Sequence, residues 1–431
     1  MMKYAVAAIV LLICSPCVFA ASVTISYWNF FTGGDGIRMK QLVQDFNKSH
    51  NGIQVDSATL KWGTPFYTKL HSAVASGNAP DVVSYHLSHF PIGIKQGDLR
   101  PNTTAELNKV GLHKDQFLKT LIDKSLADSK AYGQPGRLYG VPLDTHTLVL
   151  YYNKDVLRKA GVLGQSGQLK IQGIKQFDKM LKKIKTQTNA LPIAFASNDA
   201  PTVWRTWYTL FKQQHGTLEK NNKLYLKDLD STGLKSLRVI ANWSKRGYTS
   251  HHTSYPAMVA LFSSGRAAFM INGDWEVPTL VDGKKKGTLG FDYGIMAFPK
   301  MYANRDTWAD SHNLAIPAHK GQPMSPAKRK AVYTFIDYVE KHATIWAAGG
   351  HIPAYKPVLD SAQFKQMVPN DEYTPQAAQD VVFAPSLPVF GVASPAYNAV
   401  DNFFVPAMAG QMTPKAAMAH FRKSLVSASQ H

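Results

Sequence analysis

Apolar positions in the first part of the chain alternate between the spacing of strands and the spacing of helices. Residues 23–30 are rich in β-branched and aromatic side chains, which predicts a buried strand. A helix is predicted over 37–50, a strand over 53–55, a second helix over 65–77 and a third strand over 81–85. This order of strands and helices predicts a parallel sheet with crossover helices.

The same alternation returns later in the chain. Strands are predicted over 148–152, 191–196 and 266–272, with helices over 176–185 and 234–246 between them. A chain of 431 residues is long for a single core, so two α/β domains are expected. No repeat at a fixed period is visible, which argues against a solenoid or a propeller.

The first twenty residues have the pattern of a secretory signal peptide. Lys3 is their only charge, residues 4–13 form an apolar run too short to span a bilayer, and Ala20 precedes the expected cleavage point. Cys14 and Cys17, the two cysteines of the chain, both fall in this segment. Neither follows a small residue, so lipid attachment is the less favoured interpretation. The mature chain is expected to carry no disulfide and no cysteine metal site.

The formal net charge of +19 shows a strong excess of basic residues. These residues are scattered in short clusters, such as 182–183, 284–286 and 328–330, and form no single stripe. A dispersed, solvated surface is therefore favoured over a nucleic-acid-binding face. No nucleic-acid partner is predicted.

A series of short motifs runs along the chain in a fixed order. They are Ile25-Ser-Tyr-Trp28, Asp45-Phe-Asn-Lys48, Ala75-Ser-Gly-Asn-Ala-Pro-Asp-Val82, Gly140-Val-Pro142, Leu150-Tyr-Tyr-Asn-Lys-Asp155, Met270-Ile-Asn-Gly-Asp-Trp275, Leu314-Ala-Ile-Pro317 and Ala347-Ala-Gly-Gly350. Together they resemble the extracellular sugar-binding proteins of bacterial ABC importers, the group that includes maltose-binding protein. The match runs from residue 23 to about 356 and is weaker beyond.

The resemblance implies a two-lobed periplasmic-binding-protein architecture. Each lobe is a largely parallel sheet flanked by helices, and crossover segments join the lobes as hinges. The chain then crosses near Asp144, Arg305 and Trp346, which assigns 21–143 plus 306–345 to the N-terminal lobe and 144–305 plus 346–431 to the C-terminal lobe.

The resemblance also implies the function. The protein would be an exported, periplasmic, monomeric binding component that needs no cofactor and is not an enzyme. It would close over a small saccharide or polyol between its lobes and deliver it to a membrane permease.

A sugar presents hydroxyl groups at its edges and apolar C–H faces, so its site needs aromatic rings beside polar groups. The resemblance places Trp275, just after Asn272, where family members stack a sugar ring. Trp204 and Trp207 fall in a region that supplies contacts from the second lobe. They share a helix face, so one of them is expected to pack inward. Tyr397 aligns with another stacking position, and core packing is its alternative.

The polar candidates come from several separate segments. Gly34 and Asp35 lie in the glycine-rich first turn, where Asp35 either faces the ligand or caps the following helix. Asp144 and His146 precede a strand at the lobe junction, as ligand contacts or as a pair that stabilises the hinge. The resemblance adds Tyr85, Ser88 and His89 as contacts. Trp62, Trp308 and Asn313 are further candidates at the rim.

Other chemistry is weaker in this sequence. His86 and His89 are three residues apart, but no cysteine and no nearby carboxylate completes a metal site, so no metal is predicted. Phosphate-loop, dinucleotide, zinc-protease and serine-hydrolase motifs are absent. A glycosidase would need two paired carboxylates, and nothing pairs Asp35 with Asp144. An anionic ligand stays open as the alternative, but few arginines stand among the candidates, which favours a neutral one.

Overall fold

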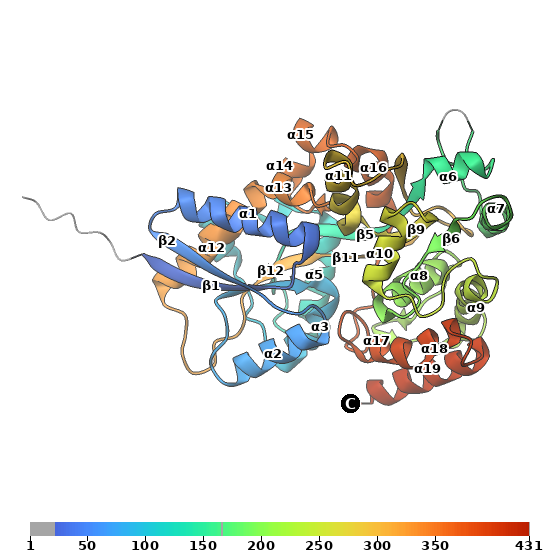
Figure 1. Ribbon diagram of the computed structural model, residues 1–431. Helices are drawn as coiled ribbons and strands as arrows, with labels where there is room; N and C mark the ends of the chain where they lie inside the picture. Colours follow the sequence, from blue (N-terminus) through green and yellow to red (C-terminus); the bar gives the residue numbers. More distant parts are fainter. Residues whose placement is uncertain (1–21, 165–166, 431) are drawn as a thin grey trace, which may run out of the picture.

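The computed structural model describes residues 22–164 and 167–430, so the predicted signal peptide lies outside the described residues. The chain forms two α/β lobes placed side by side (Figure 1). Each lobe has its own central sheet with helices packed on it, which confirms the two-lobed α/β architecture. None of the helices in the described part of the chain is both long and apolar enough to cross a membrane.

The first lobe is built on a five-stranded sheet in the order β2-β1-β3-β12-β4. Its strands are β1 (Val23–Asn29), β2 (Ile53–Thr59), β3 (Val82–His86), β4 (Val141–Pro142) and β12 (His312–Ala315). Its helices are α1 (Gly33–Ser49), α2 (Thr64–Ala75), α3 (Phe90–Gln96), α4 (Thr104–Asn108), α5 (Lys119–Tyr132), α12 (Pro326–Lys341) and α13 (Ala343–Ala347). The predicted β1, β2 and β3 pair in parallel, whereas β12 runs antiparallel to its neighbours.

The second lobe is built around the long strand β5 (Asp144–Asn153), which is buried along its whole length. The other strands of its sheet are β6 (Leu191–Ala194), β9 (Ala267–Gly273), β10 (Tyr293–Ala297), β11 (Thr307–Asp310), β13 (Ile352–Pro353) and β14 (Val381–Phe383). A separate small hairpin joins β7 (Glu219–Lys220) to β8 (Lys223–Leu224). β6 is parallel to β9, while β5 is antiparallel to β9, β10, β11 and β13.

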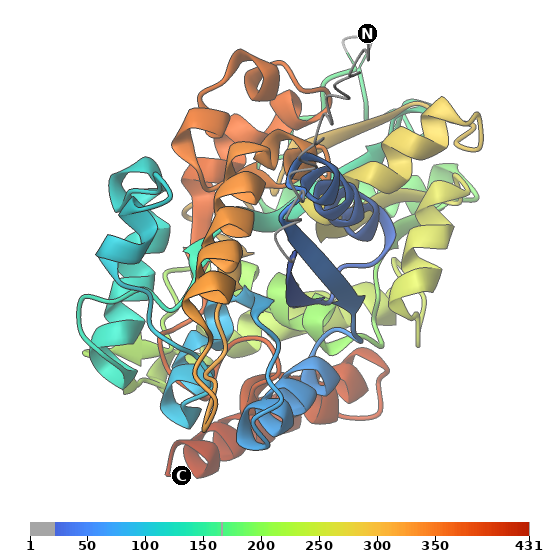
Figure 2. The same cartoon turned by 90° about the vertical axis from the view of Figure 1, so that its left-hand side faces the viewer.

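Helices cover the second lobe and complete its core. They are α6 (Lys154–Lys159), α7 (Ile174–Gln187), α8 (Ala200–Lys212), α9 (Thr232–Lys245), α10 (Tyr255–Ser263), α11 (Val277–Lys285), α14 (Lys356–Leu359), α15 (Ala362–Lys365), α16 (Asn370–Asp380), α17 (Pro395–Ala399), α18 (Val405–Met408) and α19 (Pro414–Ser429). The last part of the chain serves both lobes: α12 packs on β1 of the first, and α17 and α19 pack with α8 and α9 of the second (Figure 1, Figure 2).

Three segments carry the chain between the lobes. The first lies between β4 and β5, the second at Ser311 between β11 and β12, and the third between α13 and β13. The second crossing thus lies at Ser311, whereas the sequence placed it near Arg305. The reason is that β11 still pairs with β5 of the second lobe and only β12 joins the first sheet. Both sheets are mixed, whereas the resemblance implied largely parallel ones: every antiparallel pair described in them involves β5 or β12, the strands that follow the first and second crossings.

The glycine-rich segment after β1 forms the first turn of α1. Thr32 occupies the N-cap position of α1, and the helix runs from Gly33, four residues before the predicted start. Gly33 has a φ of 56°, a left-handed conformation that favours glycine. Asp35 in the first turn and Lys48 in the last complement the helix dipole. The N-terminal end of α1 lies against the second lobe, where Gly34 approaches Pro278 of α11.

Candidate functional site

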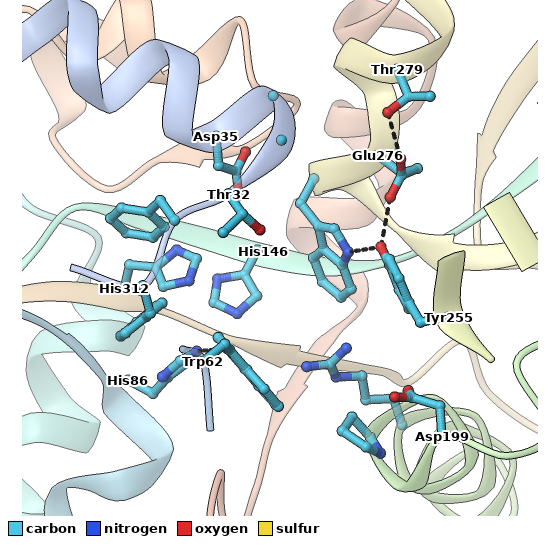
Figure 3. A pocket seen from close by; sticks show the side chains of 17 residues that line it. Thr32, Asp35, Trp62, His86, His146, Asp199, Tyr255, Glu276, Thr279 and His312 are labelled. Carbon is cyan, nitrogen blue, oxygen red and sulfur yellow. Dashed lines mark hydrogen bonds between the residues drawn. The ribbon is translucent and has the colours of Figure 1, made fainter. Parts of the chain in front are cut away.

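A cavity of about 370 Å³ lies between the two lobes (Figure 3). The first lobe contributes the segment from Phe30 to Asp35, together with Trp62, His86 and His312. The second lobe contributes the residues His146, Asp199, Pro201, Arg205, Tyr255, Trp275, Glu276 and Thr279. β1 and β3 both end at this cavity, in keeping with the tendency of α/β sheets to bind ligands beyond the carboxyl ends of their strands.

Trp62, Trp275 and the guanidinium group of Arg205 form one wall, and Trp308 lies behind it. The guanidinium carbon of Arg205 lies 4.7 Å from the ring centroids of both Trp275 and Trp308, and 5.6 Å from that of Trp62. Trp275 and Trp308 meet edge to face, with their centroids 6.2 Å apart. The wall therefore offers flat apolar surfaces beside a fixed positive charge.

Trp275 is held in place by a hydrogen-bond network on its own lobe, whose members Tyr255, Glu276 and Thr279 are labelled in Figure 3. Its Nε1 donates to the Tyr255 hydroxyl at 2.8 Å, and that hydroxyl donates to Oε2 of Glu276 at 2.6 Å. Asn272 donates to the same hydroxyl at 3.1 Å, and Thr279 donates to the other oxygen of Glu276. Burial raises the pKa of Glu276 and of Tyr255. Because its nitrogen is bound, the indole can present a ring face without changing its rotamer.

Three histidines line the cavity next to these tryptophans. His146 and His312 stack with ring centroids 4.1 Å apart, and His86 stacks on Phe30 at 4.5 Å. Nε2 of His86 accepts a hydrogen bond from Trp62. Burial lowers the pKa of His86 well below its usual value and that of His146 to about 3. These two imidazoles are therefore neutral near pH 7 and serve as uncharged hydrogen-bonding groups.

A buried cluster around Asp144 lies beneath the cavity. The Asp144 carboxylate accepts hydrogen bonds from Nδ1 of His312 at 2.8 Å, Nδ1 of His146 at 3.1 Å, the backbone N–H of His312 at 2.9 Å and Nε1 of Trp346 at 2.7 Å. Burial alone would raise the pKa of Asp144, but His312 and His351 hold it well below its usual range. The cluster joins all three crossovers, because Asp144, His312 and His351 each stand at a different one.

His351 connects this cluster to the first lobe's helix α1. Its Nε2 lies 3.0 Å from Oδ1 of Asp35, and its Nδ1 lies 3.5 Å from Oδ2 of Asp144 and 4.0 Å from Oδ1 of Asp274. Burial opposes protonation, but the carboxylates of Asp35 and Asp144 prevail and raise the pKa of His351 to about 9. The imidazolium is thus the counter-ion of the buried carboxylates.

Asp144, His146, His312 and His351 are the group of described residues that could hold a metal ion by donor type, since their ligand atoms all lie within 4.8 Å of one another. The oxygens of Asp144, however, already accept hydrogen bonds from N–H donors. These hydrogen bonds account for the arrangement without an ion. We interpret the cluster as a hydrogen-bonded junction of the three crossovers.

The structure places four of the predicted site residues on the cavity wall: Gly34, Asp35, His146 and Trp275. Trp62, a rim candidate, also lines it. Asp144 and Asn272 lie directly behind the wall, where Asp144 binds the histidines and Asn272 binds Tyr255. Trp308, another rim candidate, lies behind it as well and stacks on Arg205.

Other predicted residues lie deeper and do not line the cavity. Ser88 hydrogen-bonds to Asp310, and His89 stacks on Tyr67 at 3.6 Å and bonds the carbonyl of Val392. Tyr85 is buried against the backbone of Gly93, where a Cβ atom would lie 2.0 Å from the tyrosine hydroxyl. Asn313 is fully buried in β12 and bonds Ser311. Tyr397 is buried, and burial raises its pKa to about 12 against the effect of the nearby Arg205 charge.

Trp204 and Trp207 pack into the core of the second lobe. Both are 0 % exposed, so they present no face to the cavity, and Nε1 of Trp207 donates to the carbonyl of Gly233. The sequence expected only one of them to pack inward. Both do so because they share the α8 face that meets α9 and the C-terminal helices, whereas Pro201 and Arg205, four residues apart, occupy the face toward the cavity.

The sequence missed Arg205, Tyr255, Glu276 and His312 as cavity residues. Arg205 had a usable signal, because its place between two core tryptophans puts it on a different helix face. Glu276 directly follows the predicted Trp275, so the same sequence motif indicated it. Tyr255 and His312 carry no local signal, since they reach the cavity only through the tertiary fold.

Comparison with known proteins adds a family to this geometry. A family model described as bacterial extracellular solute-binding protein matches residues 33–344. Among curated proteins, a maltooligosaccharide ABC transporter solute-binding lipoprotein of Streptococcus pneumoniae is 22 % identical over 397 residues, covering 88 % of this chain and 84 % of that protein. The sn-glycerol-3-phosphate-binding periplasmic protein of Shigella flexneri is 23 % identical over 389 residues, covering 85 % and 82 %.

Solved structures support the fold. The GacH receptor of Streptomyces glaucescens, studied unliganded and with acarbose, superposes with a TM-score of 0.77 at 20 % identity, covering 95 % of this chain and 99 % of the receptor. A maltose-bound protein of T. maritima superposes with a TM-score of 0.78 at 18 % identity, covering 94 % and 100 %. At these identities the likeness concerns the fold alone.

Proposed function

This chain belongs to the bacterial extracellular solute-binding protein family, and from that premise we propose that it captures a small saccharide or polyol between its two lobes. The observation that carries the proposal is the cavity itself, which is bounded by both lobes and walled by the fixed ring of Trp275. Its volume of about 370 Å³ suits a ligand of one or two sugar rings.

The side chains around the cavity suit the two surfaces of a sugar. Trp275 and Phe31 offer apolar faces for C–H groups, and the neutral His146, which binds Asp144 through Nδ1, offers its Nε2 to a hydroxyl group. Asp35 and Glu276 add carboxylate acceptors. Curated relatives with names that refer to maltooligosaccharide and to glycerol phosphate support the same ligand classes.

The binding mechanism is closure of the lobes about the three crossovers. Two contacts join the rims of the lobes on one side of the cavity. Arg38 of α1 pairs with Asp282 of α11 at 3.3 Å, and Gly34 lies so close to Pro278 that a Cβ atom would approach the proline Cβ to 2.4 Å. A ligand that touches both lobes favours this arrangement over an open one, because it binds the closed form better.

The remaining parts of the proposal concern the cell and the partner. The protein is exported to the periplasm after cleavage behind Ala20, acts as a monomer and hands its ligand to an ABC permease. The family and the apolar N-terminal run support export. The proposed role is binding and not catalysis, and it is supported by the family and by the engagement of the wall carboxylates Asp35, Asp199 and Glu276 with other side chains.

A thermal-shift screen of residues 21–431 tests the proposal. The panel contains mono- and disaccharides, sugar alcohols, uronic acids and polyol phosphates. A ligand at about 100 times its Kd adds about 2.7 kcal/mol of stability, which raises the unfolding midpoint measurably. A compound that raises the midpoint supports a binding protein, provided that the protein releases no reducing ends from oligosaccharides. A panel without any hit contradicts the proposed function.

A further inference from the structure

Arg205 is an unusual group to find in a sugar cavity. Arg205 lies on α8 and is only 8 % exposed, and the rings of Trp62, Trp275 and Trp308 surround its guanidinium. Its Nε is buried without a hydrogen-bond partner. Throughout residues 22–164 and 167–430, no carboxylate lies within ion-pair distance of this guanidinium, although several exposed arginines and lysines of the chain have such a partner.

The carboxylates that share the cavity with Arg205 are engaged elsewhere. Asp199 caps α8, accepting from the backbone N–H of Thr202 at 2.9 Å and from its hydroxyl at 2.6 Å. Asp35 is bound to His351, and Glu276 accepts hydrogen bonds from Tyr255 and Thr279. The protein therefore supplies aromatic faces for the guanidinium but no counter-charge.

A buried cation without a counter-ion is costly, and aromatic rings offset only part of that cost. The rings also fix the orientation of the guanidinium beside the cavity. A planar guanidinium held in this way can bind two oxygens of one acid group at once, which a neutral hydroxyl cannot match. The neighbouring histidines add no further positive charge, since burial keeps His86 and His146 unprotonated near pH 7.

We propose that the saccharide or polyol bound in this cavity carries an acid group, a carboxylate or a phosphate, that pairs with Arg205. The inference rests on the proposed function, because it assigns the ligand class of that same cavity. The sequence favoured a neutral ligand because few arginines stood among its candidates, and the presence of Arg205 on the cavity wall removes that reason. Trp275, stacked on the same guanidinium, is placed to contact the ring or carbon chain that bears the acid group.

Isothermal titration calorimetry with matched pairs of ligands tests this assignment. Each hexuronate, hexose phosphate and polyol phosphate is compared with the uncharged sugar or polyol from which it derives. Uronates are tested both as monosaccharides and as disaccharides. The acid member is expected to bind roughly tenfold or more tightly than its parent. The uronate and phosphate arms separate the two sources of the charge.

Variants of Arg205 identify the residue responsible. Arg205→Gln is expected to bind the acid member and its parent equally, and Arg205→Lys is expected to retain a reduced preference because it keeps the charge but loses the planar fork. Arg246→Gln, at a surface arginine paired with Asp178 outside the cavity, is the matched control and should behave as the wild type. The unfolding midpoint of each variant reports whether it folds.

The outcomes separate this inference from the function on which it rests. Uncharged parents that bind the wild type as tightly as the acids overturn the acid-group inference and leave the proposed function intact. A preference for acids that persists in Arg205→Gln overturns the role of Arg205. Absence of binding to every member of the panel contradicts the proposed function as well. If Arg205→Gln does not fold, the comparison of the pairs in the wild type and in Arg205→Lys still decides.

Discussion

The imidazolium of His351 predicts a loss of stability in mild alkali. The pKa of His351 is raised to about 9 in the folded protein, against a usual value of 6.5. A histidine whose folded pKa is raised stabilises the protein fully below its unfolded pKa, and that contribution is lost as the pH rises through the folded pKa. The difference corresponds to about 3 kcal/mol, lost between about pH 6.5 and pH 9.

The groups that face His351 support this window. Asp35, Asp144 and Asp274 approach its ring nitrogens, and the rings of His146 and His312 lie with centroids 6.0 Å and 5.6 Å away. The pKa of His146 is lowered to about 3. That histidine therefore gains a proton on unfolding mainly between about pH 3 and pH 6.5, which is below this window. Burial raises the pKa of Asp274 well above its usual value, so its own titration adds to the slope where it overlaps the window.

Urea unfolding of the wild type and of His351→Gln at pH 6.5, 7.5, 8.5 and 9.5 measures the effect. The amide can still donate to Asp35 but carries no charge. The free energy of unfolding of the wild type should fall by about 3 kcal/mol across the series, while that of the variant starts lower and changes much less. His342→Gln, at an exposed histidine, is the control and should follow the wild type. Equal slopes in the wild type and His351→Gln would refute the reasoning.

Three further substitutions test the contacts between the lobes and the core. Gly34→Ala places a Cβ atom against Pro278 of the other lobe, so it should weaken ligand binding about tenfold or more by calorimetry while leaving the unfolding midpoint unchanged or higher, because alanine favours the helix; unchanged affinity would contradict the rim contact. Arg38→Gln removes the pair with Asp282 and should weaken binding by about 0.2–1 kcal/mol at low salt, with the difference vanishing in high salt. Trp204→Ala should lower the free energy of unfolding by about 3–5 kcal/mol, whereas a cost below 1 kcal/mol would exclude its place in the core.

Much of the fold could be predicted from local pattern. The parallel β1, β2 and β3 and the helices between them follow from apolar spacing, because their partners are neighbours in sequence. The second crossing was placed too early because β11 and β12 form one nearly continuous stretch. Strand pairing alone assigns β11 to the second sheet and β12 to the first, and the local pattern of apolar residues does not predict which strands pair.

The candidate site was partly visible for a similar reason. Trp275 and Asp35 stand in recognisable motifs beside strand ends, and the structure places both on the cavity wall. His312 lies on that wall and His351 lies in the cluster behind it. Both belong to crossovers far along the chain from Asp144, so no local pattern could place the three residues together. Arg205 was not predicted, because Trp204 and Trp207 were the candidates on this helix and both lie on the face that packs inward.

The role of Trp275 tests the central claim, that solute binds between the lobes, most directly. The measurement is calorimetric titration of the wild type, Trp275→Ala and Trp28→Ala with the ligand found by screening. Trp28 lies on β1, partly buried and away from the cavity, and serves as the matched control. Trp275→Ala should weaken binding by at least about 2 kcal/mol, as for a buried aromatic anchor, while Trp28→Ala binds as the wild type does. Equal affinities for the wild type and Trp275→Ala would contradict the claim.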